Sequence, residues 1–183
     1  MNMDDRLGLL FGTYEDKLYR LARRLSANAE DASDLVQDTF VRAAQALSSI
    51  PSGAQEYAWL VRVLINLRRD QWRKASVRAR AAPHVIPVHE AVPATAESAL
   101  IAKRAVWQAL DTLAPRRRAI VVLAEIDGMP PADIASLLGV AVMTVRWHLS
   151  MARRELKRML ADYMGERHED THRYPARRRS AAR

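Results

Sequence analysis

The chain has 183 residues, enough for one or two domains, and its formal net charge is +8. It contains no cysteine, which excludes disulfides and thiolate metal sites, and it has no apolar run long enough to predict a membrane-spanning helix. Acidic residues stand near its start, where a secretory signal would be basic, so we expect a cytoplasmic protein without membrane insertion.

Helical periodicity dominates the sequence. Apolar residues recur at steps of three and four, and no segment shows convincing alternation with a period of two, so the predicted fold is all-α. We expect two small helical domains, at residues 1–78 and 98–163, joined by a linker at 79–97 that Pro83, Pro87 and Pro93 keep from forming a helix. The basic tail, residues 164–183, has almost no apolar content and is expected to be disordered.

The first domain is predicted to contain helices over residues 7–25, 31–47 and 55–78, with a break at 26–31 and a loop at 48–53. Its second helix carries Asp31, Asp34 and Asp38 at helical spacing. Such a stripe could bind a cation, but helices more often use it as a solvated or partner-binding face. Residues 1–78 hold twelve basic and ten acidic side chains, and this near balance suits a protein-binding surface.

The third helix is strongly basic and includes Trp59 and Trp72. Basic side chains follow phosphates and aromatic rings stack on unpaired bases, so this helix predicts contact with nucleic acid. The alternative is that both tryptophans anchor the core and that the arginines form a solvated face. For Trp59 we favour the core, and for the arginines as a set we favour nucleic acid.

The second domain is predicted to contain a helix over residues 98–113, capped by Thr95 or Ser98, and a helix over 115–126 opened by Pro115. A helix-turn-helix follows: a short helix at 132–138, a turn at Gly139 and a longer helix from about residue 142. Its buried stripe is Val145, Leu149, Ala152 and Leu156, and its outward face holds Met143, Trp147, Ser150 and Arg154, with Arg146 and Arg153 beside them.

A buried stripe behind a face of arginine, tryptophan and serine suits a helix in the major groove, the alternative being a helical hairpin with a solvated basic side. Residues 98–163 carry ten basic and six acidic side chains, and this excess would attract phosphates. The chain has no glycine-rich phosphate loop, nucleophile motif or ligand-spaced histidine pair on a predicted helix. We therefore expect binding rather than catalysis, with no cofactor and no metal.

Three motifs now point to a family: DLVQDTFVRA at 34–43, WLVRVLINLRRDQWRK at 59–74 and DIASLLGVAVMTVRWHLSMARREL at 133–156. By the order and spacing of these motifs, the chain resembles bacterial RNA polymerase sigma factors of the extracytoplasmic-function type, which keep sigma regions 2 and 4. The resemblance implies a non-enzymatic protein that binds core RNA polymerase and directs promoter-specific transcription initiation. The alternative is a helix-turn-helix regulator that is not a polymerase subunit.

The resemblance also implies partners and site residues. The clamp of the largest polymerase subunit would contact Asp34, Gln37 and Asp38, and the flap is a further polymerase contact. The −10 promoter element would be bound and melted by Ser48, Ser49, Trp59, Arg62, Asn66, Arg69 and Arg73, with a flipped base in the 48–53 loop and with Asp70 fixing its neighbours by side-chain pairing. The −35 duplex would be bound by Met143, Thr144, Arg146, Trp147, Ser150, Arg153 and Arg154.

An anti-sigma factor is a further implied partner. The chain departs from the family pattern in its recognition helix, where Ala141 replaces a capping serine and where Trp147, His148 and Met151 are unusual. We expect these four positions to encode this protein's own promoter choice.

Overall fold

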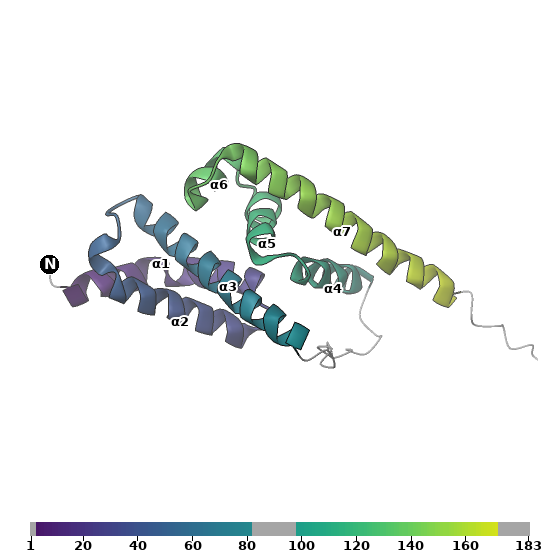
Figure 1. Ribbon diagram of the computed structural model, residues 1–183, viewed down its shortest axis with the longest axis horizontal. Helices are drawn as coiled ribbons and strands as arrows, with labels where there is room; N and C mark the ends of the chain where they lie inside the picture. Colours follow the sequence, from purple (N-terminus) through teal and green to yellow (C-terminus); the bar gives the residue numbers. More distant parts are fainter. Residues whose placement is uncertain (1–2, 82–97, 172–183) are drawn as a thin grey trace, which may run out of the picture.

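The computed structural model describes residues 3–81 and 98–171, and every regular element in those ranges is helical, which confirms the predicted all-α class (Figure 1). In chain order the elements are α1 (Met3–Leu25), α2 (Ala29–Gln45), the 3₁₀ helix η1 (Leu47–Ser49), α3 (Gln55–Ala81), α4 (Ser98–Asp111), α5 (Pro115–Val121), the π-helical turn η2 (Val122–Ile126), α6 (Pro131–Leu138) and α7 (Val142–Thr171).

The first three helices form a bundle in which α2 packs against both α1 and α3. Each helix contributes its predicted apolar face, and Leu18, Leu35 and Leu64 at its centre are inaccessible to solvent. The break before α2 is shorter than predicted. The side chain of Asn28 accepts a 2.7 Å hydrogen bond from the amide of Asp31, and this N-cap lets the helix begin at Ala29.

In the second group, α5 lies between α3 and α7, and α4 and α6 both pack against α7 (Figure 1). Pro115 stands in the first turn of α5 as predicted, where its missing amide hydrogen leaves no bond unmade. The helical stretch ends at Ile126 as predicted, but its second half is not an ordinary α-helix. There the backbone widens into η2, and the amide of Asp127 bonds the carbonyl of Val122 at 3.0 Å.

The last helix is longer than predicted. Residues 165–171, expected to belong to a disordered tail, continue α7 as far as Thr171. Most of the predicted linker, residues 82–97, and the remaining tail, residues 172–183, lie outside the described residues. Within the described ranges, no single helix is long and apolar enough to cross a membrane. Taken together, α6 and the first part of α7 reach that length and apolar content, but the pair is sharply bent.

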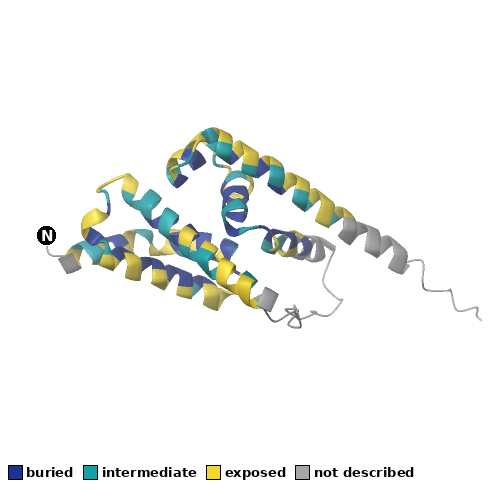
Figure 2. Cartoon of the chain, viewed as in Figure 1, coloured by how far each residue is buried: buried dark blue, intermediate teal, exposed yellow. Residues whose placement is uncertain are grey.

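The two groups of helices share one apolar core. α3 packs against α5 and α6, and α1 also contacts α5. The buried cluster runs without a break from Leu25 and Leu64 in the first group to Ile120 and Ile134 in the second. Figure 2 shows the buried positions along the inward sides of α1 and α2 and through α5. The packing therefore fixes the position of α3 relative to the helix-turn-helix.

Candidate nucleic-acid interface

The outward face of α2 carries the three side chains predicted to contact polymerase. Asp34, Gln37 and Asp38 are exposed, while Leu35 and Val36 between them are buried. The steps of three and four place the three polar side chains on one face of the helix. A surface cavity between α2 and α3 is lined by Asp38 and by further residues of both helices.

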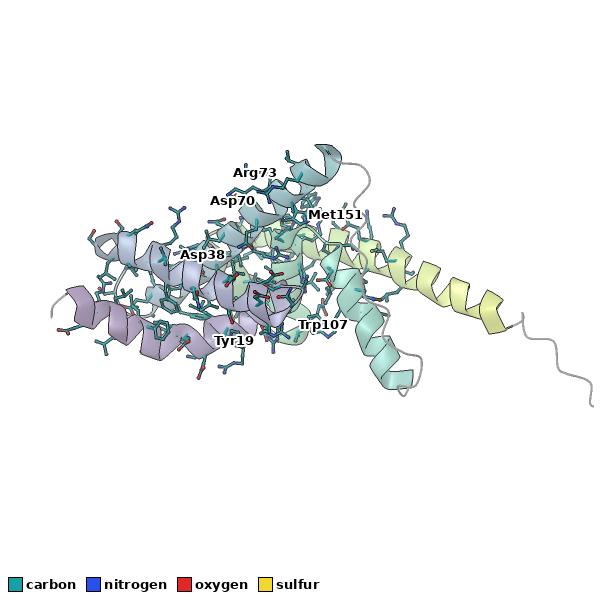
Figure 3. All side chains as sticks on the ribbon, turned by 90° about the horizontal axis from the view of Figure 1, so that it is seen from below. Tyr19, Asp38, Asp70, Arg73, Trp107 and Met151 are labelled. Atoms are coloured by element: carbon teal, nitrogen blue, oxygen red, sulfur yellow. The ribbon has the colours of Figure 1, made fainter. Side chains whose placement is uncertain are left out.

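The solvent side of α3 is basic, and one carboxylate organises it. The Oδ1 atom of Asp70 lies 3.6 Å from Nε of Arg69 and 3.7 Å from Nη2 of Arg73. Figure 3 shows Asp70 and Arg73 on α3 above Asp38 on α2. All three groups of the pairing are substantially exposed, so it orients the arginines more than it stabilises the fold. The predicted role of Asp70 in fixing its neighbours agrees with these contacts.

The other predicted −10 residues differ in their surroundings. Asn66 is exposed, whereas Trp59 is half-buried and packs against the core, as favoured for it from the sequence. Arg62 is also half-buried, and its side chain faces the second group of helices. Its Nη1 atom lies 3.5 Å from the position that a Cβ would take at Gly139. The structure thus places Asn66 and the Arg69–Arg73 pair toward solvent and Arg62 toward the helix-turn-helix.

The predicted base-binding loop is partly a 3₁₀ helix, because Ser48 and Ser49 belong to η1 and are exposed on it. Arg6 of α1 holds this segment. Its guanidinium donates to the carbonyl of Leu47 at 3.0 Å and to that of Ile50 at 2.8 Å. Sequence reasoning missed Arg6, since its partners are 41 and 44 residues away and no local pattern marks such a contact.

The turn between α6 and α7 depends on glycine. Gly139 has φ 64° and ψ 44°, the left-handed conformation that favours glycine, and its amide closes α6 by bonding the carbonyls of Ala135 and Ser136. At the start of α7, the amides of Thr144 and Val145 bond the carbonyl of Ala141, whose side chain has no acceptor to offer. The helix therefore begins without a side-chain cap from residue 141, as the alanine at that position predicted.

The two faces of α7 match the prediction. Val145, Leu149 and Ala152 are buried, and Leu156 is half-buried against the same core. On the outer side Met143 is 70% exposed and Trp147 is 53% exposed. Four polar side chains of this face are also exposed, namely Arg146, Ser150, Arg153 and Arg154. Thr144 is half-buried. A shallow cavity bounded by Pro131 of α6 opens among these polar side chains and Leu149.

Ion pairs brace α7 against the preceding helices. Arg153 donates to Oε1 of Glu125 from Nη2 at 2.7 Å and from Nε at 3.2 Å, so this predicted −35 residue is engaged within the protein. Arg117 of α5 pairs with Glu155, and its guanidinium carbon lies 6.0 Å from the centroid of the Trp147 ring. α7 is thus held on both sides of its outward face.

His148 stands beside Trp147 and packs edge-on to it, with ring centroids 4.9 Å apart. Its Nδ1 atom is buried and has no hydrogen-bond partner among the described residues. Burial lowers the pKa of His148 from its ordinary value, and the positive charges of Arg116 and Arg117 lower it further. The imidazole is therefore favoured in its neutral form on the inner side of the recognition helix.

Arg118 joins the two groups of helices. It is 4% exposed, its Nε donates to the carbonyl of Arg24 at 2.8 Å, and it pairs with Asp111 at the end of α4. Burial lowers the pKa of its guanidinium, against the opposing effect of Asp111. Next to it Arg24 pairs with Asp127, the residue that follows η2. Sequence reasoning gave Arg118 no role of its own, since the charge pattern does not mark it among three consecutive arginines.

The comparisons with known proteins assign both groups of helices. Residues 10–78 match the family Sigma-70 region 2, and residues 103–156 match Sigma-70, region 4. The chain is 34% identical over 152 residues to the ECF RNA polymerase sigma factor SigM of Mycobacterium tuberculosis, covering 82% of this chain and 75% of SigM. It is 35% identical over 157 residues to the ECF RNA polymerase sigma factor SigE of Mycolicibacterium smegmatis, covering 84% of this chain but only 61% of SigE.

A solved structure has a similar fold. The sigma factor RpoE of Bartonella quintana, in complex with the anti-sigma factor NepR, has a TM-score of 0.59 and 28% identity, and the match covers 86% of this chain and 96% of RpoE. The two region matches and the identity to SigM agree with the motifs and the helix-turn-helix described above. The chain belongs to the extracytoplasmic-function family of RNA polymerase sigma factors, non-catalytic subunits that direct transcription initiation.

Proposed function

We propose that this sigma factor binds core RNA polymerase through α2, binds the −35 promoter element with α7 and melts the −10 element with α3. The observation that carries the proposal is the outer face of α7, where exposed arginines and Ser150 lie opposite the buried stripe of the helix-turn-helix. A helix of this kind fits the major groove, and its arginines attract phosphates. The family membership removes the alternative of a regulator that is not a polymerase subunit.

The proposed polymerase surface is formed by Asp34, Gln37 and Asp38. These exposed side chains lie on a helix whose other face is fixed in the core, so a partner would meet a rigid acidic surface. Rigid presentation lowers the entropy lost on binding, and charge complementarity to a basic clamp would speed the encounter.

The proposed −10 surface combines the exposed Asn66, Arg69 and Arg73 of α3 with Ser48 and Ser49 of η1. Arginines oriented by Asp70 would follow the backbone of the displaced strand. Arg6 would hold η1 in place while a base leaves the duplex. Trp59 and Arg62 complete the predicted set, although the core and α6 cover part of each.

We also propose an anti-sigma partner. The structure of RpoE that resembles this chain was solved in complex with the anti-sigma factor NepR. A protein that binds across α2, α3 or α7 would block polymerase or promoter, so it would hold this sigma factor inactive.

The proposal is tested by run-off transcription with purified core RNA polymerase, on a promoter in duplex form and on the same promoter premelted at −10. We expect Asp34→Arg and Asp38→Arg to weaken binding to core polymerase. We expect the double variant Asn66→Ala with Arg69→Ala to reduce transcription from the duplex promoter more than transcription from the premelted one. Asp16→Arg, which changes an exposed carboxylate on α1, is the matched control. Absence of binding between the unaltered protein and core polymerase would overturn the proposal.

A further inference from the structure

Two large apolar side chains project from the beginning of the recognition helix. Met143 and Trp147 are 70% and 53% exposed and stand four residues apart, on the side of α7 opposite the buried Val145 and Leu149. They are separated by slightly more than one turn of helix, about 6 Å along the axis. Neither side chain packs into the core in this position. Exposed apolar groups that lie next to each other are typical of a binding surface.

The protein holds Trp147 in its exposed position. The guanidinium of Arg117 lies 6.0 Å from the centroid of the indole ring, and Arg117 is itself fixed by its ion pair with Glu155. The edge of His148 contacts the same ring, at 4.9 Å between centroids. The indole is therefore oriented before any ligand arrives, which reduces the entropy lost on binding.

The charges around the pair identify the occupant. Arg146 is exposed next to Met143 and Trp147, and Arg154 is exposed two turns further along α7, whereas Glu125 of η2 and Glu155 of α7 are paired with Arg153 and Arg117. An apolar protein partner would have to cover these cations, while a duplex would place phosphates against them. This step rests on the proposed function, in which α7 enters the major groove.

The major groove offers one apolar group to a protein, the C5 methyl of thymine. We propose that Met143 and Trp147 recognise thymine methyl groups in the −35 element, with Arg117 positioning the indole. Two apolar side chains one helical turn apart can meet methyl groups on neighbouring base pairs. The specificity of this sigma factor then depends on apolar contacts, in addition to the hydrogen bonds that Arg146 and Ser150 can donate.

The test uses duplexes selected by the holoenzyme from a library randomised over the −35 region. Each thymine of the selected element is replaced in turn by deoxyuridine, which lacks only the 5-methyl group. We expect one or two replacements to weaken binding by the unaltered holoenzyme about fourfold, the loss expected for one methyl group. In Met143→Ala or Trp147→Ala holoenzymes the unmodified duplex should bind more weakly, and the sensitive replacement should cause no further loss.

Met159→Ala is the matched control, because it removes an exposed methionine from a later turn of the same helix and should keep the sensitivity to deoxyuridine. Arg117→Met should reduce the sensitivity at the position assigned to Trp147. A selected element without thymine, or equal losses in the unaltered protein and both alanine variants, would overturn the inference. Failure of the holoenzyme to select any duplex would instead count against the proposed function, so the two failures are distinguishable.

Discussion

Removing either partner of the Arg118–Asp111 ion pair is expected to destabilise the protein, but unequally. The Arg118 side chain is 5% exposed and that of Asp111 is 26% exposed. Asp111→Ala leaves a guanidinium almost without water, and breaking a buried pair in this way costs about 3–5 kcal/mol. Removing a carboxylate from the last turn of α4 returns about 0.5 kcal/mol, since negative charge is unfavourable there. The expected net loss is about 3 kcal/mol.

Arg118→Met removes the buried cation and leaves the carboxylate of Asp111 unpaired. Methionine keeps much of the apolar stem, the Asp111 carboxylate stays partly exposed to solvent, and the Arg24 carbonyl loses one hydrogen bond. Unmade hydrogen bonds of this kind cost about 1–2 kcal/mol, so this variant should be the more stable of the two. The measurement is urea unfolding of the full chain followed by circular dichroism, comparing midpoints at a constant m-value.

Arg153→Met serves as the control for this pair of variants. Its side chain and that of Glu125 are 67% and 47% exposed, so the expected loss is below about 0.5 kcal/mol. If Arg118→Met were as destabilising as Asp111→Ala, or more so, the buried cation left without its carboxylate would not be the main cost of breaking this ion pair.

Three further predictions follow from the packing of the recognition helix and of the two groups of helices. Burial, and then two nearby arginines, lower the pKa of His148 in the folded state, so the unfolded chain binds more protons near pH 6. The free energy of unfolding should therefore fall as the pH is lowered through and below about 6.5. His148→Gln should flatten this part of the profile of melting temperature against pH. In Gly139→Ala the alanine must adopt φ near 64°, which should lower the free energy of unfolding by about 1–2 kcal/mol, measured by urea titration. Gly8→Ala on α1 is the control, because a Cβ there meets nothing within 4 Å and should not destabilise the protein. Cysteines placed at Arg24 and Asp127, in a chain with no other cysteine, should be joined readily by a short bismaleimide. On the proposed function, the two groups of helices separate to hold both promoter elements, so the joined protein should lose run-off transcription while the unjoined double variant retains it. Full activity after joining would contradict this separation.

The sequence predicted the long amphipathic helices well, because burial of one face imposes a period of 3.6 that survives in the residue pattern. α7 shows this best, since its buried Val145, Leu149 and Ala152 were predicted, as were its exposed Met143 and Trp147. The pattern also placed Pro115 and Gly139 correctly, because each meets a local backbone requirement.

Contacts between distant residues were not predicted. Arg118 and Arg24 are 94 residues apart, and no local periodicity distinguishes the buried Arg118 from the half-buried arginines at the two preceding positions. The widening of the backbone at η2 was also missed, since its residues suit an ordinary α-helix equally well. The extension of α7 shows the limit of composition as a guide. Low apolar content suggested disorder from Gly165 onward, but no proline stands between Val142 and Thr171 to interrupt the hydrogen bonding.

The contact of α3 with α5 and α6 has a consequence for how affinity for a promoter is measured. Elements centred near −35 and −10 are about 25 base pairs apart, roughly 85 Å of duplex at 3.4 Å per step. On the proposed function, a molecule that holds both elements at once cannot keep α3 against α6, where the structure places it. The packed form then acts as a competitor for DNA within the same chain, and apparent affinity falls in proportion to the fraction of molecules that are open. Free protein would therefore bind a promoter more weakly than its DNA contacts alone permit, and polymerase would raise that affinity by holding the chain open.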